Sequence, residues 1–181
     1  SLVGKPAPEL RVGEWIKGVP LDRFEPGRIY VVDLWATWCG PCRAAIPHLT
    51  RIAQKYPGEV EVIGVSISEM QDSPEDRKYI GRVKTFVSKM GDQMDYRVAV
   101  DRSDHFIHTT WYKTAGTAGI PTAYVIDRKG RVAWVGIGSP KDVERIVEEV
   151  RAGTFDHAKE VKRQRQLEAA AKDRSEADRA A

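Results

Sequence analysis

The only two cysteines of this 181-residue chain, Cys39 and Cys42, are separated by two residues. At this spacing both side chains fit within one turn of a helix, near enough to each other to close a disulfide. The nucleophile in disulfide exchange is the thiolate, and a free cysteine, with a pKa of about 8.5, is mostly thiol at neutral pH. The pair can therefore carry out thiol–disulfide chemistry if the fold around it ionises one of the two sulfurs.

The segments on either side of the pair predict such an environment for Cys39. Residues 28–34 (Arg-Ile-Tyr-Val-Val-Asp-Leu) have the composition of a buried strand, and residues 41–56 are expected to form a helix with Pro41 in its first turn. A compact turn through Gly40 and Pro41 then places Cys39 at the helix N-terminus, where unpaired amide groups and the helix dipole favour the thiolate. We expect Cys39 to be the nucleophile and Cys42 to be the shielded thiol that resolves the mixed disulfide.

Zinc and haem sites also use a Cys-X-X-Cys pair. Zinc needs two further soft ligands, but the chain has no third cysteine, and the closely spaced His105 and His108 begin 63 residues after Cys42. A covalently attached haem requires a histidine directly after the second cysteine, and Arg43 stands there. The sequence therefore favours a redox pair and predicts no metal.

Asp33 is an acidic residue within an apolar strand. A buried, unpaired carboxylate costs several kcal/mol, and such a group usually responds with a raised pKa. A raised pKa suits a general acid or base that moves a proton at Cys42. The alternative is that Asp33 lies at the strand end, where it is solvated or caps the next turn.

Composition places the chain among soluble globular proteins, with 41% hydrophobic and 30% charged residues. The net charge of +3 is too small to indicate binding to nucleic acid or to a membrane surface. The chain contains no run of about 18 apolar residues, so the sequence predicts no transmembrane helix. Because the chain begins at Ser1, without an initiating methionine or the features of a signal peptide, we expect a processed protein or an excised piece.

The order of the predicted elements indicates an α/β domain. An Asp-Arg-Lys-Gly turn at residues 127–130 joins the last two strands and predicts that they are antiparallel, whereas helices between the earlier strands favour parallel pairing. A last core helix is expected from Pro140, with Ser139 as its N-cap and Gly153 as its stop. The predicted strands are 28–34, 60–67, 96–100, 122–127 and 131–137, the other long helices 41–56 and 75–90, and the apolar face of the last helix Val143, Ile146, Val147 and Val150.

Residues 35–42 (Trp-Ala-Thr-Trp-Cys-Gly-Pro-Cys) resemble the active-site signature of the thioredoxin superfamily. Pro47 resembles the proline that kinks the family's active-site helix, and residues 118–122 (Ala-Gly-Ile-Pro-Thr) resemble its cis-proline loop. The resemblance implies a thioredoxin-like fold, a central mixed sheet flanked by helices. It also implies that Pro121 follows a cis peptide bond and that Ile120 offers backbone groups to a substrate chain. An ordinary trans turn is the alternative at Pro121.

Two further segments resemble the TlpA/ResA-like branch of the superfamily: an N-terminal extension containing Gly-Lys-Pro-Ala-Pro at residues 4–8, and a helical insert near 104–114, before the cis-proline loop. The resemblance covers about residues 3–153, and we expect residues 1–153 to form one thioredoxin-like domain. It implies a thiol-disulfide oxidoreductase of the periplasm or another extracytoplasmic compartment, although two cysteines are also compatible with the cytoplasm.

We therefore expect an enzyme that reduces protein disulfides, with an upstream thiol as electron donor and no cofactor beyond the Cys39–Cys42 pair. The expected contacts with substrate are Trp38, Gly40, Pro41, Ile120 and Pro121. A redox-auxiliary binding module of a larger assembly is one alternative. A thiol peroxidase is another, but its Thr-X-X-Cys site is absent because Thr37 precedes Cys39 by two residues.

Residues 154–181 differ from the rest of the chain, because they are rich in alanine and charged residues and include only two large aliphatic residues, Val161 and Leu167. Their helix propensity is high, and Glu168 with Lys172 would make a favourable i, i+4 pair. Without an apolar stripe such a helix has little to pack against. We expect a solvated or frayed helical tail, or a linker or contact helix that leads to another domain or subunit.

Overall fold

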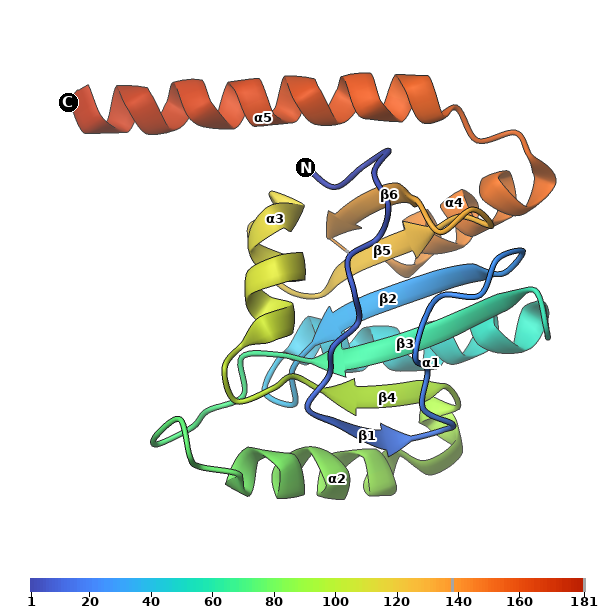
Figure 1. Ribbon diagram of the computed structural model, residues 1–181, viewed down its shortest axis with the longest axis vertical. Coiled ribbons are helices and arrows are strands. Elements are labelled where there is room, and N and C mark those ends of the chain that lie inside the picture. The colour runs from blue at the N-terminus through green and yellow to red at the C-terminus, as the bar shows by residue number, and fades with distance from the viewer. Residues whose placement is uncertain (138, 181) are drawn as a thin grey trace.

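The computed structural model describes residues 1–137 and 139–180, and its centre is a mixed six-stranded sheet in the order β1-β4-β3-β2-β5-β6 (Figure 1). Strands β2, β3 and β4 are parallel, while β5, β6 and β1 run antiparallel to their neighbours. The strands are β1 (Glu14–Lys17), β2 (Ile29–Trp35), β3 (Val60–Ser66), β4 (Arg97–Val100), β5 (Thr122–Ile126) and β6 (Val132–Ile137).

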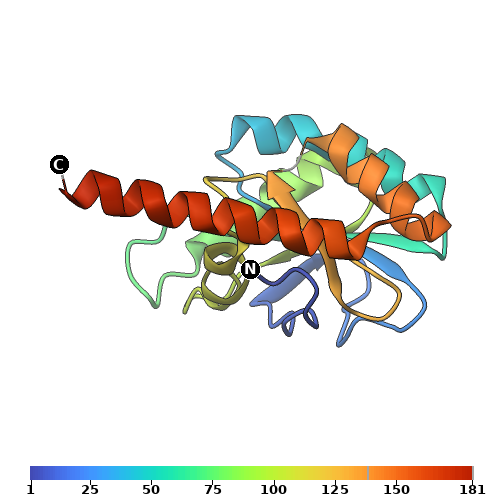
Figure 2. The same ribbon diagram turned by 90° about the horizontal axis from the view of Figure 1, so that it is seen from above.

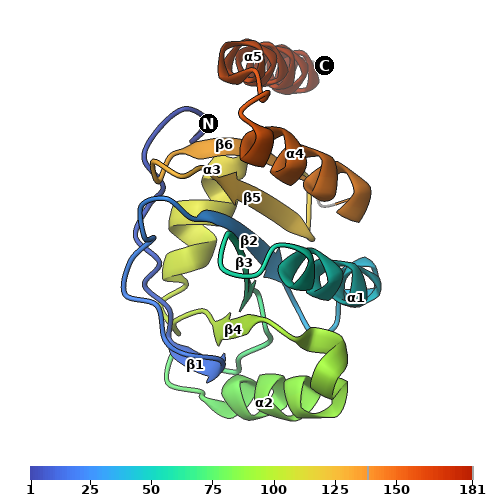
Figure 3. The ribbon, with the colours of Figure 1, turned by 90° about the vertical axis from the view of Figure 1, so that its right-hand side faces the viewer.

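Helices cover both faces of the sheet (Figure 3). The helices α1, α2 and α4 lie on one face, and α3, together with the N-terminal segment, lies on the other. All seven residues of β2 are buried, since this central strand packs side chains against both layers. The helices are α1 (Gly40–Lys55), α2 (Lys78–Met90), α3 (Lys113–Ala115), α4 (Pro140–Ala152) and α5 (His157–Ala180), with a 3₁₀ turn at Gly91–Met94 and a π-helical turn at His108–Tyr112.

The five strands predicted from the sequence are confirmed to within one residue at each end, and so is the antiparallel pairing of the last two. Strand β1 was not predicted. It is an edge strand of four residues, all of them half-buried, so it carries neither an apolar run nor a clear alternation.

The helices also follow the sequence closely. In α4 all four residues of the expected apolar face are buried, and Gly153 ends the helix in the left-handed conformation with φ of 73°. The side chain of Ser139 makes no capping hydrogen bond, although its carbonyl accepts one from the amide of Val143. The predicted insert before the cis-proline loop is confirmed as the π-helical turn followed by α3.

The expectation of a solvated or frayed tail is wrong for the first half of α5, which lies along β6 (Figures 1 and 2). Glu160 and Gln164 are buried there, and the Gln164 Nε2 donates a hydrogen bond to the carbonyl of Val135 at 3.3 Å. The second half, beyond Leu167, is exposed. Lys172 lies 3.8 Å from Glu176 instead of forming the expected pair with Glu168.

Candidate redox active site

Cys39 and Cys42 form a disulfide at the start of α1, with Cα atoms 5.3 Å apart. Cys39 is the N-cap residue, and its sulfur accepts a hydrogen bond from the amide of Cys42 at 3.2 Å. Cys39 is 5% exposed, whereas Cys42 is fully buried. The geometry thus gives one sulfur an amide donor at a helix N-terminus and limited access to solvent, and hides the other sulfur behind it.

The loop between β2 and Cys39 is held by a carboxylate that sequence reasoning missed. Glu69 is 7% exposed and accepts hydrogen bonds from the amide and the hydroxyl of Thr37, at 2.7 and 2.8 Å. The hydroxyl of Ser66 donates a third bond to Glu69 at 2.7 Å. A buried carboxylate with three donors is a rigid anchor, so the chain after β3 fixes the residues that lead into the cysteine pair.

Trp38, next to the outer cysteine, is 56% exposed, and its Nε1 donates to the carbonyl of Ser68 at 3.0 Å. Gly40 and Pro41 are exposed beside it. These three residues were predicted to contact substrate, and the structure places them together on the rim of the disulfide. Trp35, by contrast, is completely buried.

The predicted cis peptide bond between Ile120 and Pro121 is confirmed. The carbonyl oxygen of Ile120 lies 3.7 Å from the Cys39 sulfur, so the loop faces the disulfide as expected. Thr122, the residue after the proline, donates from its hydroxyl to the carbonyl of Gly119 at 2.6 Å, which ties the two ends of the loop together. Cys39 and Ile120 are 81 positions apart in the sequence, and the fold brings them together at the rim of the disulfide site.

Asp33 lies within β2, paired with Gly64 of β3 and Ala123 of β5, and is 2% exposed. The alternative of a solvated position at the strand end is therefore wrong. Burial raises the pKa of its carboxyl group from 3.8 to about 7. Asp33 has the same strand parity as Val31 and Trp35, which pack in one cluster with Cys42, so its carboxyl group is directed to the face of the sheet that carries the disulfide.

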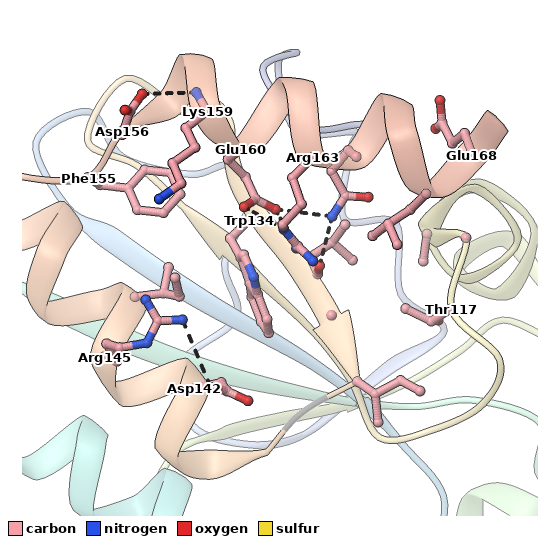
Figure 4. A pocket seen from close by; sticks show the side chains of 18 of the residues that line it. Thr117, Trp134, Asp142, Arg145, Phe155, Asp156, Lys159, Glu160, Arg163 and Glu168 are labelled. Atoms are coloured by element: carbon pink, nitrogen blue, oxygen red, sulfur yellow. Dashed lines mark hydrogen bonds and ion pairs between the residues drawn. The ribbon is translucent and has the colours of Figure 1, made fainter. Parts of the chain in front are cut away.

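A groove of about 1160 Å³ starts at the loop before the cis peptide bond, which contributes Thr117, and runs between α4 and α5 (Figure 4). Trp134 of β6 lies in the middle of its floor, Arg145 stands on the α4 side, and the exposed Leu167 belongs to the α5 side. The sequence did not predict this groove, because it exists only where α5 lies over the sheet.

The part of the chain that the structure describes holds neither a cluster of metal-ligating side chains nor a membrane-spanning helix. Within residues 1–137 and 139–180, histidine, cysteine and acidic side chains do not gather in groups of three or more that could hold a metal ion. Of the helices in those ranges, none has the length and apolar composition to cross a membrane.

Comparison with known proteins places this geometry in a family. The AhpC/TSA family matches residues 3–135. The thiol:disulfide interchange protein HelX of Rhodobacter capsulatus is 30% identical over 161 residues, which cover 86% of this chain and 81% of HelX. Protein FixW of Rhizobium leguminosarum is 30% identical over 135 residues, which cover 74% of this chain but only 60% of FixW. A thiol-disulfide oxidoreductase ResA of Bacillus thuringiensis is 28% identical over 138 residues, covering 75% of this chain and 70% of ResA.

Solved structures agree with the sequence relatives. A thioredoxin-family thiol:disulfide interchange protein from Chlorobium tepidum has a TM-score of 0.60 and 28% identity, over 80% of this chain and 94% of that protein. A thioredoxin-like protein in the oxidised form has a TM-score of 0.65 and 25% identity, over 82% of this chain and 96% of that protein. The chain belongs to the AhpC/TSA family, and it has the thioredoxin-like fold and the Cys-X-X-Cys pair of a thiol-disulfide oxidoreductase.

Proposed function

We propose that this protein reduces disulfides in other proteins, with Cys39 as the attacking sulfur. The observation that carries the proposal is the contrast between the two sulfurs. Cys39 receives the Cys42 amide at the N-terminus of α1 and is partly accessible, while Cys42 is fully buried. In the reduced protein the same amide and the helix dipole favour a thiolate at Cys39 over one at Cys42.

The reaction then has two sulfur transfers. The Cys39 thiolate attacks one sulfur of the substrate disulfide, the substrate S–S bond breaks, and the leaving sulfur takes up a proton. Asp33 accepts the proton of the Cys42 thiol, and Cys42 attacks the sulfur of Cys39. The Cys39–Cys42 disulfide forms while the bond between Cys39 and the substrate sulfur breaks. The second substrate sulfur leaves and takes up a proton, and two electrons have passed to the substrate. An upstream thiol donor returns the protein to its reduced form, and no further cofactor takes part.

Substrate contacts are proposed from the rim of the site. The exposed Trp38, Gly40 and Pro41 lie on one side of the disulfide, and the backbone of Ile120 before Pro121 lies on the other. Backbone groups recognise an extended peptide independently of its side chains, which suits a reductase with protein substrates.

The direction of the reaction and the location of the protein are also proposals. Gly40 and Pro41 stand between the cysteines as in thioredoxin, so we expect a potential near about −270 mV and far from the roughly −120 mV of the oxidant DsbA. The resemblance of residues 3–153 to the TlpA/ResA-like branch favours an extracytoplasmic location.

Reduction of insulin by the pre-reduced protein tests the activity. We expect the pre-reduced wild-type protein to reduce insulin in a stoichiometric amount and Cys39→Ser not at all, whereas Cys42→Ser should accumulate a mixed disulfide through Cys39. If insulin reduction by the wild-type protein does not exceed that by Cys39→Ser, the chain is a binding module whose disulfide does not exchange with protein substrates. A redox titration against glutathione that places the pair near the oxidising end would reverse the proposed direction.

A further inference from the structure

The exposed face of α2 carries uncompensated positive charge. The helix contains four basic residues, Lys78, Arg82, Lys84 and Lys89, and no acidic residue. Lys84 pairs with Glu14 of β1 at 2.7 Å. Arg82 and Lys89 are exposed and form no ion pair within residues 1–137 and 139–180. This face therefore presents two free cations to solvent.

A hollow of about 440 Å³ places these cations beside the redox site. It is lined by Thr37, two residues before Cys39, and by Gly81, Arg82, Thr85, Phe86 and Lys89 of α2. The ring of Phe86 is half-buried and packs on the ring of Trp35, with centroids 5.3 Å apart. The hollow thus combines an aromatic surface with two positive charges, and it adjoins the loop that leads to the outer cysteine.

A third cation reaches the hollow from α1. Arg43 lies one turn after Cys39, and its amide donates to the carbonyl of Cys39 at 3.1 Å. Its guanidinium group lies over the ring of Phe86, 5.7 Å from the ring centroid. Arg43 is exposed and, like the two cations of α2, has no ion-pair partner in the part of the chain that the structure describes. We refer to Arg43, Arg82, Lys89 and Phe86 together as the basic surface.

Two acidic side chains near the basic surface have other partners. The carboxylate of Asp76, in the loop before α2, accepts hydrogen bonds from the amides of Asp72 and Lys78 at 3.1 and 2.8 Å. Glu69 is buried and anchors the loop at Thr37. The positive charge of the surface is therefore complementary to negative charge on another molecule.

Gly81 leaves the hollow open. Glycine destabilises the interior of a helix relative to alanine. A Cβ atom on Gly81 would have no neighbour within 4 Å, so packing does not require a glycine at this position. The missing side chain instead leaves room above the helix, which a side chain of a partner can occupy.

We propose that the basic surface docks an acidic segment of the protein that exchanges disulfides with Cys39. Carboxylates of this segment pair with Arg82 and Lys89, and an apolar side chain between them rests on Phe86. Arginine and aromatic residues are enriched in protein interfaces, and complementary charge speeds association. An anionic membrane would offer the same charge, but the surface adjoins a disulfide whose partner is a protein. The inference deepens the proposed function, and the identity of the partner rests on it.

The test uses three peptides that are each closed by one disulfide and differ only in flanking residues, which are all glutamate, all glutamine or all lysine. The rate at which each peptide oxidises the pre-reduced protein is measured by acid quenching and mass spectrometry. With the wild-type protein at low ionic strength, the glutamate peptide should react about tenfold faster than the glutamine peptide. Added salt should reduce this ratio because it screens exposed charges.

The double variant Arg82→Glu/Lys89→Glu should reverse the preference, so that the lysine peptide becomes the fastest. A change that only loosened the loop before Cys39 would slow all three peptides alike. Arg43 is left in place, because a charge one turn from Cys39 also affects the thiolate.

Lys5→Glu/Lys129→Glu is the matched control. It makes the same change in charge at two exposed lysines beside the turn between β5 and β6, at the end of the sheet opposite the disulfide. This variant should keep the preference for the glutamate peptide. Equal rates for the three peptides with the wild-type protein, or one preference shared by both double variants, would overturn the proposal.

A binding measurement separates this proposal from the proposed function. If no peptide oxidises the wild-type protein, the proposed function fails. Docking is then decided with the glutamate peptide carrying serines in place of its cysteines. Its addition to the oxidised protein should shift the amide NMR signals of α2, and unchanged signals would overturn the proposal. Pelleting of the protein with phosphatidylserine-containing vesicles, without a preference among the peptides, would assign the surface to a membrane instead.

Discussion

Cys39 and Asp33 reach their chemical states through opposite physical effects. At Cys39 the amide of Cys42 and the start of α1 stabilise a negative charge near the surface. At Asp33 burial destabilises a negative charge inside the sheet and raises the pKa of the carboxyl group to about 7. In the proposed mechanism these two effects supply an anionic nucleophile near the surface and a proton acceptor inside the sheet.

The difference between the two sulfurs predicts selective alkylation. In the reduced protein at pH 7, Cys39 should react with iodoacetamide several-fold faster than free cysteine, because a larger fraction of it is thiolate. Cys42 is fully buried and should remain unmodified on the same timescale. Mass spectrometry of timed samples measures both rates, and Cys42→Ser serves as the control with a single thiol. Equal rates at the two positions would contradict the assignment of roles.

Asp33 predicts how stability depends on pH in the oxidised protein. Its pKa is about 7 in the folded state and 3.8 as a model value. Well below pH 3.8 the carboxyl group is neutral in both states and does not affect the free energy of unfolding. Between about pH 4 and 7 the unfolded chain releases the proton while the folded protein keeps it, so unfolding is favoured. The penalty is complete above pH 7 and amounts to roughly 4 kcal/mol.

Asp33→Asn removes this penalty, so its advantage over the wild type in the free energy of unfolding should grow from pH 4 to pH 8 by up to about 4 kcal/mol. Urea unfolding of both oxidised proteins at the two pH values measures the change. A difference that does not vary with pH would show that Asp33 is already ionised in the folded protein at pH 4.

At the scale of elements, what the sequence could predict depends on distance along the chain. Strand β2, the turn and α1 follow one another directly, so composition alone located Cys39 at a helix N-terminus. Glu69 acts on Thr37 across 32 positions, and no local pattern shows which turn its carboxylate will reach. The cis peptide bond was predicted from resemblance, since physical propensity favours trans.

The anchoring role of Glu69 predicts a loss of stability in Glu69→Ala. The amide of Thr37 and the hydroxyl of Ser66 would lose their acceptor, so the free energy of unfolding should fall by about 1–3 kcal/mol. Insulin reduction should slow several-fold because the loop before Cys39 loosens. Met70→Ala is the control, since the neighbouring Met70 is 76% exposed. If both variants unfold like the wild type, the carboxylate does not anchor the loop.

At the scale of the whole molecule, α5 changes the shape of a thioredoxin-like domain. Its first half packs against β6 and the N-terminal segment, and its second half projects past the end of the sheet where β2 and β3 finish (Figures 1 and 2). This is also the end that carries Cys39. The sequence did not predict the packing because polar residues make it: Gln164 bonds to the backbone of β6, and Glu160 is buried beside Arg163. Hydrophobic periodicity cannot reveal such a contact.

Val161 is the apolar part of this contact and carries the last prediction. Its Cγ2 lies 3.1 Å from the position of a Cβ on Gly4, and it packs in one cluster with Val3. Val161 is half-buried against an apolar cluster, where a carboxylate would lose part of its hydration, so Val161→Asp should release α5 from the domain. Hydrogen exchange followed by mass spectrometry should then show lost protection in residues 157–165 and, together with them, in residues 2–8. Ala177→Asp, on the exposed half, should change neither segment. If residues 2–8 keep their protection in Val161→Asp, the N-terminal segment is held by β6 alone, through bonds such as that from the Gly4 amide to the carbonyl of Val132.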